Sequence, residues 1–173
     1  MPLPGRILVR GRFPHNAGVA NPGDVLENPI TGQSLTFRRT TAETGGQLLE
    51  VESSWEPAGR EPPEHYHPNQ DEHFQVLEGE LRARVGGVEQ TVREGETLDV
   101  PPATPHTMWN AGATRTRAVW QTRPALKTEA FFEMLWGLAQ ASARGEEGPD
   151  PERAAAMLSE YTDEFRLGRP GSA

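Results

Sequence analysis

Residues 59–72 read Gly-Arg-Glu-Pro-Pro-Glu-His-Tyr-His-Pro-Asn-Gln-Asp-Glu, which places His65, His67 and Glu72 close together in the chain. Alternate side chains of a β-strand lie on the same face, so we expect the two imidazoles to leave one face together. Glu72 lies an odd number of residues beyond His67 and would reach the opposite face of an unbroken strand. Residues 68–70, Pro-Asn-Gln, favour a turn that resets this alternation. The stretch therefore predicts two histidines and a carboxylate on one interior surface.

Strand patterning continues beyond this stretch. Phe74 and Val76 share the face of Glu72, which indicates that the carboxylate points inward, whereas the neighbouring His73 and Asp71 are predicted to point outward. We expect residues 77–80, Leu-Glu-Gly-Glu, to form a tight hairpin turn. The strand after it alternates Leu81, Ala83 and Val85 with two arginines, as a half-buried strand should.

A third histidine follows a second strand-like run. Leu98 and Val100 alternate with polar residues after Gly95, and residues 101–105, Pro-Pro-Ala-Thr-Pro, break the strand just before His106. We therefore expect His106 to enter the same interior from a different strand. Three imidazoles and one carboxylate together are a ligand set suited to a divalent transition metal.

These residues resemble the motifs of the cupin superfamily, G(x)5HxH(x)4E(x)6G and G(x)5PxG(x)2H(x)3N. The first motif is occupied by Gly59, His65, His67, Glu72 and Gly79, and the second by Gly95, Pro101, His106 and Asn110. Ala103 stands where the family usually has glycine. The resemblance covers residues 59–110 and is specific there, because two independent patterns agree in order and ligand type.

The resemblance implies an all-β, double-stranded β-helix (jelly-roll) barrel in which His65, His67, Glu72 and His106 hold the metal. In the family pattern Asn110 secures a local turn. Strand-like alternation over residues 47–55 and 115–122 independently favours a sandwich or barrel.

The chain is expected to contain an irregular N-terminal arm (1–24), the barrel (25–124) and a C-terminal helical extension (125–173). Apolar residues at helical spacing predict a helix over residues 128–143. Asp150, Pro151 and Glu152 predict the start of a second helix, whose apolar stripe is Ala154, Met157, Leu158, Tyr161 and Phe165. We expect both stripes to pack on the barrel or on a second subunit rather than to form a substrate lid.

Composition limits the classes of partner. A formal net charge of −8 argues against a nucleic-acid surface, and the absence of cysteine leaves only nitrogen and oxygen ligands for a metal. No segment approaches the roughly 20 apolar residues of a membrane span, and the first residues lack a signal-peptide pattern, so we expect a cytoplasmic protein. An exposed edge strand near Leu35 and the wide apolar helix face over residues 131–138 predict a homodimer.

The predicted ligand set leaves open positions on the metal for a substrate, or for a substrate and dioxygen. Resemblance to small cupins favours a metal-dependent enzyme acting on a small organic molecule, with dioxygenase chemistry ahead of isomerase or decarboxylase chemistry. Iron, manganese, nickel, zinc and copper all stay open. An interior lining of Phe74, Val76, Leu98, Val100, Met108 and Trp120 favours an apolar or aromatic substrate.

Two alternatives compete with this hypothesis. The first is a binding or sensing protein that uses the metal to capture a small molecule without turnover. The second is a metal-free sugar epimerase, which the intact set of ligand residues disfavours.

Overall fold

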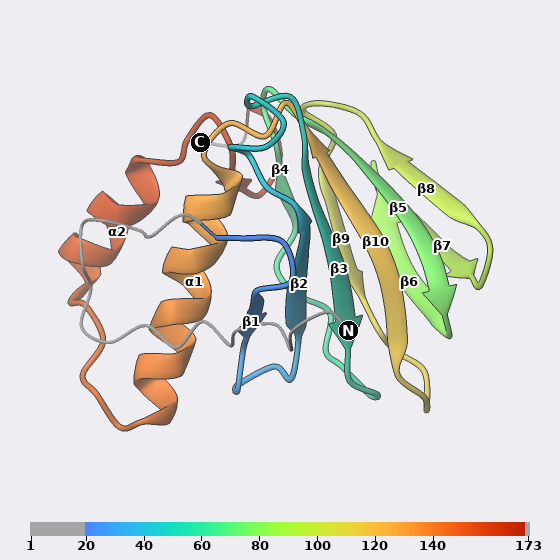
Figure 1. The fold of residues 1–173 in the computed structure, drawn as a ribbon, viewed down its shortest axis with the longest axis horizontal. Helices are drawn as coiled ribbons and strands as arrows, with labels where there is room; N and C mark the ends of the chain where they lie inside the picture. Colours follow the sequence, from blue (N-terminus) through green and yellow to red (C-terminus); the bar gives the residue numbers. More distant parts are fainter. Residues whose placement is uncertain (1–19, 172–173) are drawn as a thin grey trace.

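Two antiparallel sheets form a jelly-roll sandwich in the computed structural model, which describes residues 20–171 (Figure 1). The first sheet has the strand order β1 (Val25–Glu27), β2 (Ser34–Arg39), β3 (Leu49–Trp55), β10 (Thr116–Arg123), β5 (Asp71–Glu78), β8 (Thr97–Val100). The second has the order β11 (Arg166–Leu167), β4 (His65–Tyr66), β9 (His106–Trp109), β6 (Glu80–Val85), β7 (Val88–Arg93). Within residues 20–171 the strands form two separate sheets rather than one closed ring. Most of the predicted N-terminal arm lies outside the described residues.

One face of the first sheet carries apolar side chains across β2, β3, β10 and β5. Trp120 of β10 pairs in register with Val51 on one side and Phe74 on the other, and Val51 pairs in turn with Phe37. Directly paired residues of antiparallel strands share a face, so these side chains form one continuous apolar surface. Trp120 packs against the core clusters at both ends of this surface.

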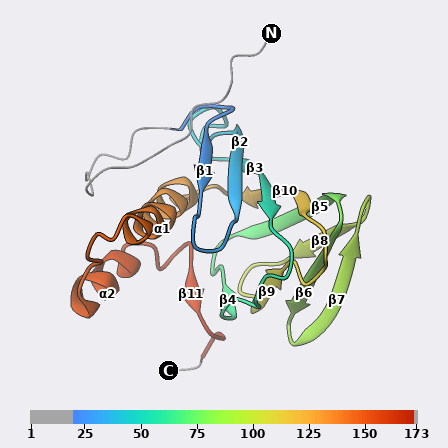
Figure 2. The ribbon, with the colours of Figure 1, turned by 90° about the horizontal axis from the view of Figure 1, so that it is seen from below.

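Two different elements cover this surface. Over β10, β5 and β8 the second sheet contributes Leu81, Ala83 and Val92 to the core. Over β1, β2 and β3 the helix α1 (Thr128–Ala143) contributes Phe131, Phe132 and Trp136 (Figure 2). The helix therefore occupies the place where a wider second sheet would lie, and each large side chain that it buries contributes about 1.5–3 kcal/mol.

Both predicted helices are present. The helix over residues 128–143 has the predicted bounds, and the carboxylate of Asp150 caps α2 (Pro151–Ser159) by accepting from the backbone N–H of Arg153 at 2.9 Å. The second helix is shorter than its apolar stripe suggests, because it ends at Ser159 while Tyr161 and Phe165 continue beyond it. Among the described residues no helix has the length and apolar character needed to cross a membrane.

The two surfaces from which we expected a homodimer are buried within the chain. Strand β1 lies outside β2, so the segment around Leu35 is not an edge, and the Leu35 side chain is fully buried. Phe131, Phe132 and Trp136 are also buried, against the sheet. The homodimer therefore stays a prediction, and neither of these two surfaces supports it.

The predicted hairpin at residues 77–80 is wrong. Strand β5 pairs with β10 and β8, whereas β6 pairs with β7 and β9, so the chain crosses from one sheet to the other at Gly79. The hairpin instead joins β6 to β7, with Val85 paired to Val88 across Gly86 and Gly87. The local sequence favours a tight turn both at the crossing and at the hairpin. Only the pairing of the strands distinguishes the two.

Gly79 permits this crossing for two reasons. Its φ is +75°, and a Cβ built there would lie 2.5 Å from the carbonyl oxygen of Arg115. A side chain at Gly79 would therefore meet both an unfavourable backbone conformation and a backbone clash.

We predict that Gly79→Ala lowers the free energy of unfolding by about 3 kcal/mol, whereas Gly87→Ala lowers it by about 1 kcal/mol. Gly87 is the matched control, because its φ is +85° and no atom lies within 4 Å of a Cβ built there. Urea denaturation monitored by tryptophan fluorescence measures both losses. Equal losses in the two variants would show that contact with Arg115 does not constrain the crossing.

Candidate metal centre

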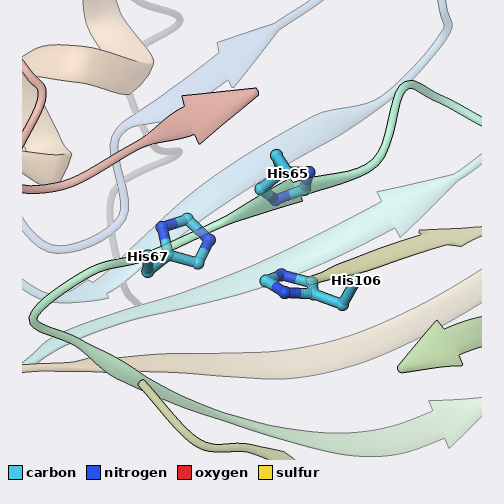
Figure 3. Close-up of side chains that lie close together, drawn as sticks. All are labelled: His65, His67 and His106. Carbon is cyan, nitrogen blue, oxygen red and sulfur yellow. The ribbon is translucent and has the colours of Figure 1, made fainter. Parts of the chain in front are cut away.

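The three motif histidines come from the second sheet. His65 lies in β4 and His106 in β9, and the two residues are directly paired, so their side chains share a face. His67 follows β4 and is buried. Figure 3 shows the three imidazoles converging from these two segments. Glu72 reaches them from β5 of the first sheet, after the predicted turn at Pro68 and Asn69.

The three predicted histidine ligands lie close together, and the predicted carboxylate ligand, Glu72, contacts two of them. The ligand nitrogens of His65, His67 and His106 all lie within 4.8 Å, a group that could hold a metal ion. Glu72 Oε1 lies 3.3 Å from His67 Nε2, and Glu72 Oε2 lies 2.9 Å from His106 Nε2. A metal bound at about 2.1 Å by each nitrogen would hold the three nitrogens within about 4.2 Å of one another.

Backbone carbonyls determine which nitrogen of each imidazole is available. The Nδ1 atoms of His67, His106 and His65 lie 2.5 Å from Glu164 O, 2.9 Å from Thr104 O and 3.4 Å from Pro63 O, respectively. A carbonyl can only accept, so each Nδ1 is assigned the hydrogen. The Nε2 atoms then carry lone pairs, which is the form that binds a metal.

Two polar atoms at the centre of this cluster lack hydrogen-bond partners. His67 Nε2 and Glu72 Oε2 are both fully buried and unpaired. The other carboxylate oxygen, Glu72 Oε1, accepts a hydrogen bond from Trp120 Nε1 at 2.9 Å. Unpaired buried acceptors cost about 1–3 kcal/mol each, and a cation between them would remove that cost. The residues present therefore fit a divalent metal with nitrogen and oxygen ligands.

Electrostatics favour the ligating forms of Glu72 and His65, but not that of His106. Burial opposes ionisation of Glu72, but His67, His106 and His65 outweigh it and hold its pKa at about 2. Burial lowers the pKa of His65 to about 3, and the neighbouring imidazoles add to this shift. Burial also opposes protonation of His106, but the Glu72 carboxylate outweighs it and raises the pKa of His106. At neutral pH Glu72 is a carboxylate and His65 is uncharged.

Residues predicted to point away from the site do so. His73 lies on the outer side of β5, where its Nδ1 pairs with Asp99 Oδ1 at 2.6 Å. His15, the remaining histidine, lies outside the described residues.

Asn110 secures a turn, as the family pattern implies. Its Nδ2 donates to the carbonyl oxygens of Trp55, Glu56 and Thr114 at 3.1, 3.2 and 2.7 Å. Its Oδ1 accepts from the backbone N–H of Gly112 at 2.9 Å. Asn110 thus joins the end of β3 to the loop after β9. None of these hydrogen bonds reaches the three imidazoles.

Ala103 keeps the backbone conformation of the glycine that it replaces. Its φ is +57°, and its backbone N–H donates to the carbonyl oxygen of His67 at 2.8 Å. The turn before His106 is therefore tied directly to the backbone of His67. The methyl group does not prevent His106 from reaching the cluster.

Several residues that contact the site were not identified from the sequence. The ring of Phe165 stacks on His65 with centroids 4.9 Å apart and planes at 29°, and the Glu164 carbonyl meets His67. Both residues lie nearly a hundred positions from these histidines, and no local pattern connects them. Strand alternation predicts that the Trp120 side chain points inward, but it does not predict the hydrogen bond from Trp120 to Glu72.

The expected apolar lining is mostly packed core. Phe74, Val76 and Val100 are at most 2% exposed, so they support the site rather than line an open pocket. Met108 and Trp120 are only partly buried. A cavity of about 640 Å³ lies elsewhere, between the end of α1 and the β1–β2 loop.

Comparison with known proteins relates this geometry to a family. Residues 51–122 match the family model for the cupin domain. An oxidoreductase of Arthrobotrys oligospora is 31% identical over 112 residues, which cover 60% of this chain and 44% of that protein. The tetracenomycin polyketide synthase protein TcmJ of Streptomyces glaucescens is 36% identical over 92 residues, which cover 53% of this chain and 60% of that protein. The chain thus spans about half the length of these relatives.

Among solved structures, an RmlC-like cupin from Shewanella frigidimarina has a TM-score of 0.50 at 20% identity, and the match covers 60% of this chain and 86% of that one. This likeness concerns the fold. The matched family model and the occupied motif positions agree, and residues 51–122 are a cupin domain within a jelly-roll sandwich.

Proposed function

We propose that this protein is a metal-dependent cupin that acts on a small apolar or aromatic molecule, with oxidoreductase chemistry of the dioxygenase type. The observation that carries the proposal is the pair of buried, unpaired atoms His67 Nε2 and Glu72 Oε2, which face a common centre with His65 and His106. The oxidoreductase name of the Arthrobotrys oligospora relative supports the class of reaction.

The proposed ligands are His65, His67 and His106 through Nε2 and Glu72 through Oε2. When bound, a divalent ion would polarise an oxygen atom of the substrate, and iron, manganese, nickel or copper, unlike zinc, could also exchange an electron with dioxygen. The donor set suits all five metals and does not select one.

The chain itself orients the ligands. Trp120 donates to Glu72 Oε1, which leaves Oε2 as the carboxylate oxygen without a hydrogen bond. Carbonyl acceptors hold the hydrogen of each imidazole on Nδ1. Since the low pKa values of Glu72 and His65 already favour the ligating forms at neutral pH, binding requires no proton to leave these two groups.

Aromatic side chains surround one side of the cluster. The ring of Trp120 lies 4.9 Å from that of Phe132, and the ring of Phe165 lies 4.9 Å from both Phe131 and His65. Such rings exclude water and make this side of the cluster apolar. They support an apolar or aromatic substrate in preference to a sugar phosphate.

The proposed ligand role of His106 predicts the effect of its removal. We expect His106→Ala to lose stoichiometric metal after purification without chelators, because it removes one of the three nitrogen donors. His73→Ala is the matched control, since His73 lies in a motif strand but faces Asp99 on the outer side. Elemental analysis of both variants and of the unmodified protein measures the metal content. Equal metal content in all three proteins would contradict the proposed site.

The hydrogen bond from Trp120 predicts a smaller effect. We expect Trp120→Phe to weaken metal binding about 10- to 100-fold, because Glu72 loses the donor that orients it. Trp109→Phe is the control, because Trp109 is a buried tryptophan of β9 that stacks under Arg84 instead. Isothermal titration with one metal compares the affinities, and unchanged affinity in Trp120→Phe would remove the orienting role.

The reaction class is tested by oxygen consumption. We expect protein reconstituted separately with iron, manganese, nickel and copper to consume oxygen with at least one of a panel of flavonols, diketones and thiols. The His106→Ala protein, treated identically, is the control for metal released into solution. If the protein binds metal at full occupancy but consumes no oxygen with any compound, the non-catalytic binding or sensing alternative is favoured.

A further inference from the structure

The segment that follows α2 lies against the strand that carries His65. We call residues 161–169 the C-terminal strap. Its strand β11 pairs antiparallel with β4, with Arg166 opposite Tyr66 and Leu167 opposite His65 (Figure 2). The cupin family match ends at residue 122, so the strap lies outside the matched region.

The strap contacts two of the proposed metal ligands. The carbonyl oxygen of Glu164 accepts the Nδ1 hydrogen of His67 at 2.5 Å, in a buried contact. The ring of Phe165 stacks on His65 at 4.9 Å and contacts His67 edge-on at 6.2 Å. Consecutive strap residues thus act on two imidazoles, one through a hydrogen bond and one through ring stacking.

The strap is held at both ends. Before Phe165, the Glu164 carboxylate accepts from the backbone N–H of Lys127 at the start of α1, at 3.1 Å. After Phe165, the backbone N–H of Gly168 donates to the carbonyl oxygen of Glu64 at 2.8 Å, and Arg169 Nε lies 2.6 Å from the Glu64 carboxylate. The ion pair is exposed and contributes little, so the backbone bond next to His65 is the more important attachment.

We propose that the strap is a built-in part of the metal centre, in which Phe165 and the Glu164 carbonyl are positioning groups for His65 and His67. The inference rests on the proposed metal binding. Strand β4 has only two residues and pairs with β9 at a single position, His65 with His106. Without β11, β4 would be an edge strand with no partner on one side, and His65 would lose the ring packed on it.

Release of the strap has a defined chemical consequence at His67. With Glu164 displaced, the buried Nδ1–H loses its acceptor, and the hydrogen is free to move to Nε2. That tautomer presents a hydrogen instead of a lone pair to the metal. Release therefore weakens metal binding without removing any ligand.

The first test compares two proline variants of the full chain. Gly168→Pro removes the N–H that bonds to Glu64, and proline cannot adopt the φ of +81° found at Gly168. Gly171→Pro makes the same change at the same φ of +81° just beyond the strap. We expect Gly168→Pro to lower the affinity for Co²⁺ about 10- to 100-fold and to change its visible spectrum, with Gly171→Pro unchanged. Co²⁺ binding and spectra identical to those of the unmodified protein in Gly168→Pro would overturn the proposal.

The second test addresses Phe165 by conservative replacement. We expect Phe165→Leu to weaken Co²⁺ binding and alter its spectrum, whereas Phe165→Tyr keeps the stacked ring and restores both. Equal effects of leucine and tyrosine would show that ring stacking on His65 has no positioning role.

The third test needs neither a variant nor a bound metal. In the metal-free protein, long-range ¹H–¹⁵N correlation spectra are expected to show the hydrogen of His67 on Nδ1, and a hydrogen on Nε2 would overturn the proposal. If the unmodified protein binds no metal, the proposed function fails, yet this tautomer still decides the role of the strap. Where Co²⁺ does bind, linkage requires it to slow hydrogen exchange at the Gly168 amide, and unchanged exchange would contradict the coupling.

Discussion

The arrangement of this protein depends on one electrostatic constraint: the Glu72 carboxylate lies against a cluster of three imidazoles and contacts two of them, His67 and His106. Oxygen and nitrogen acceptors at 2.9 and 3.3 Å do not attract one another without a proton or a cation between them. The fold nevertheless holds them together, because each is fixed from behind. Trp120 holds the carboxylate, backbone carbonyls hold the imidazoles, and the Ala103 amide holds the backbone of His67.

The supports of this cluster come from both sheets and from the helical extension. The first sheet supplies Glu72 and Trp120 from adjacent strands, and the second supplies the histidines. Helix α1 completes the core where the second sheet does not reach, and its first residues also contact the buried Gln70, whose amide donates to Thr128 Oγ1 at 2.8 Å. The extension is therefore part of the packing that positions the site, not an appendage to a finished barrel.

The matched family model covers the proposed ligands but only part of their surroundings. The matched family model covers residues 51–122 and includes all four proposed ligands, but it does not include α1, α2 or the strap. Similar ligand sets serve different reactions, so function follows from what surrounds the ligands. In this chain the surroundings are the rings of Trp120, Phe132 and Phe165, two of which lie outside the matched region.

The sequence by itself determined the positions whose evidence is local. Two-residue alternation placed His67, Glu72 and His106 in the interior and His73 outside, and helical spacing with an Asp150 cap identified both helices. Only the tertiary structure decided that Gly79 crosses between sheets, that β1 covers the strand around Leu35, and that Phe165 stacks on His65. The physical reason is that alternation, caps and turn residues act over a few positions of the chain. Strand pairing and ring stacking join residues that are far apart in the sequence, and such contacts produce no local sequence pattern.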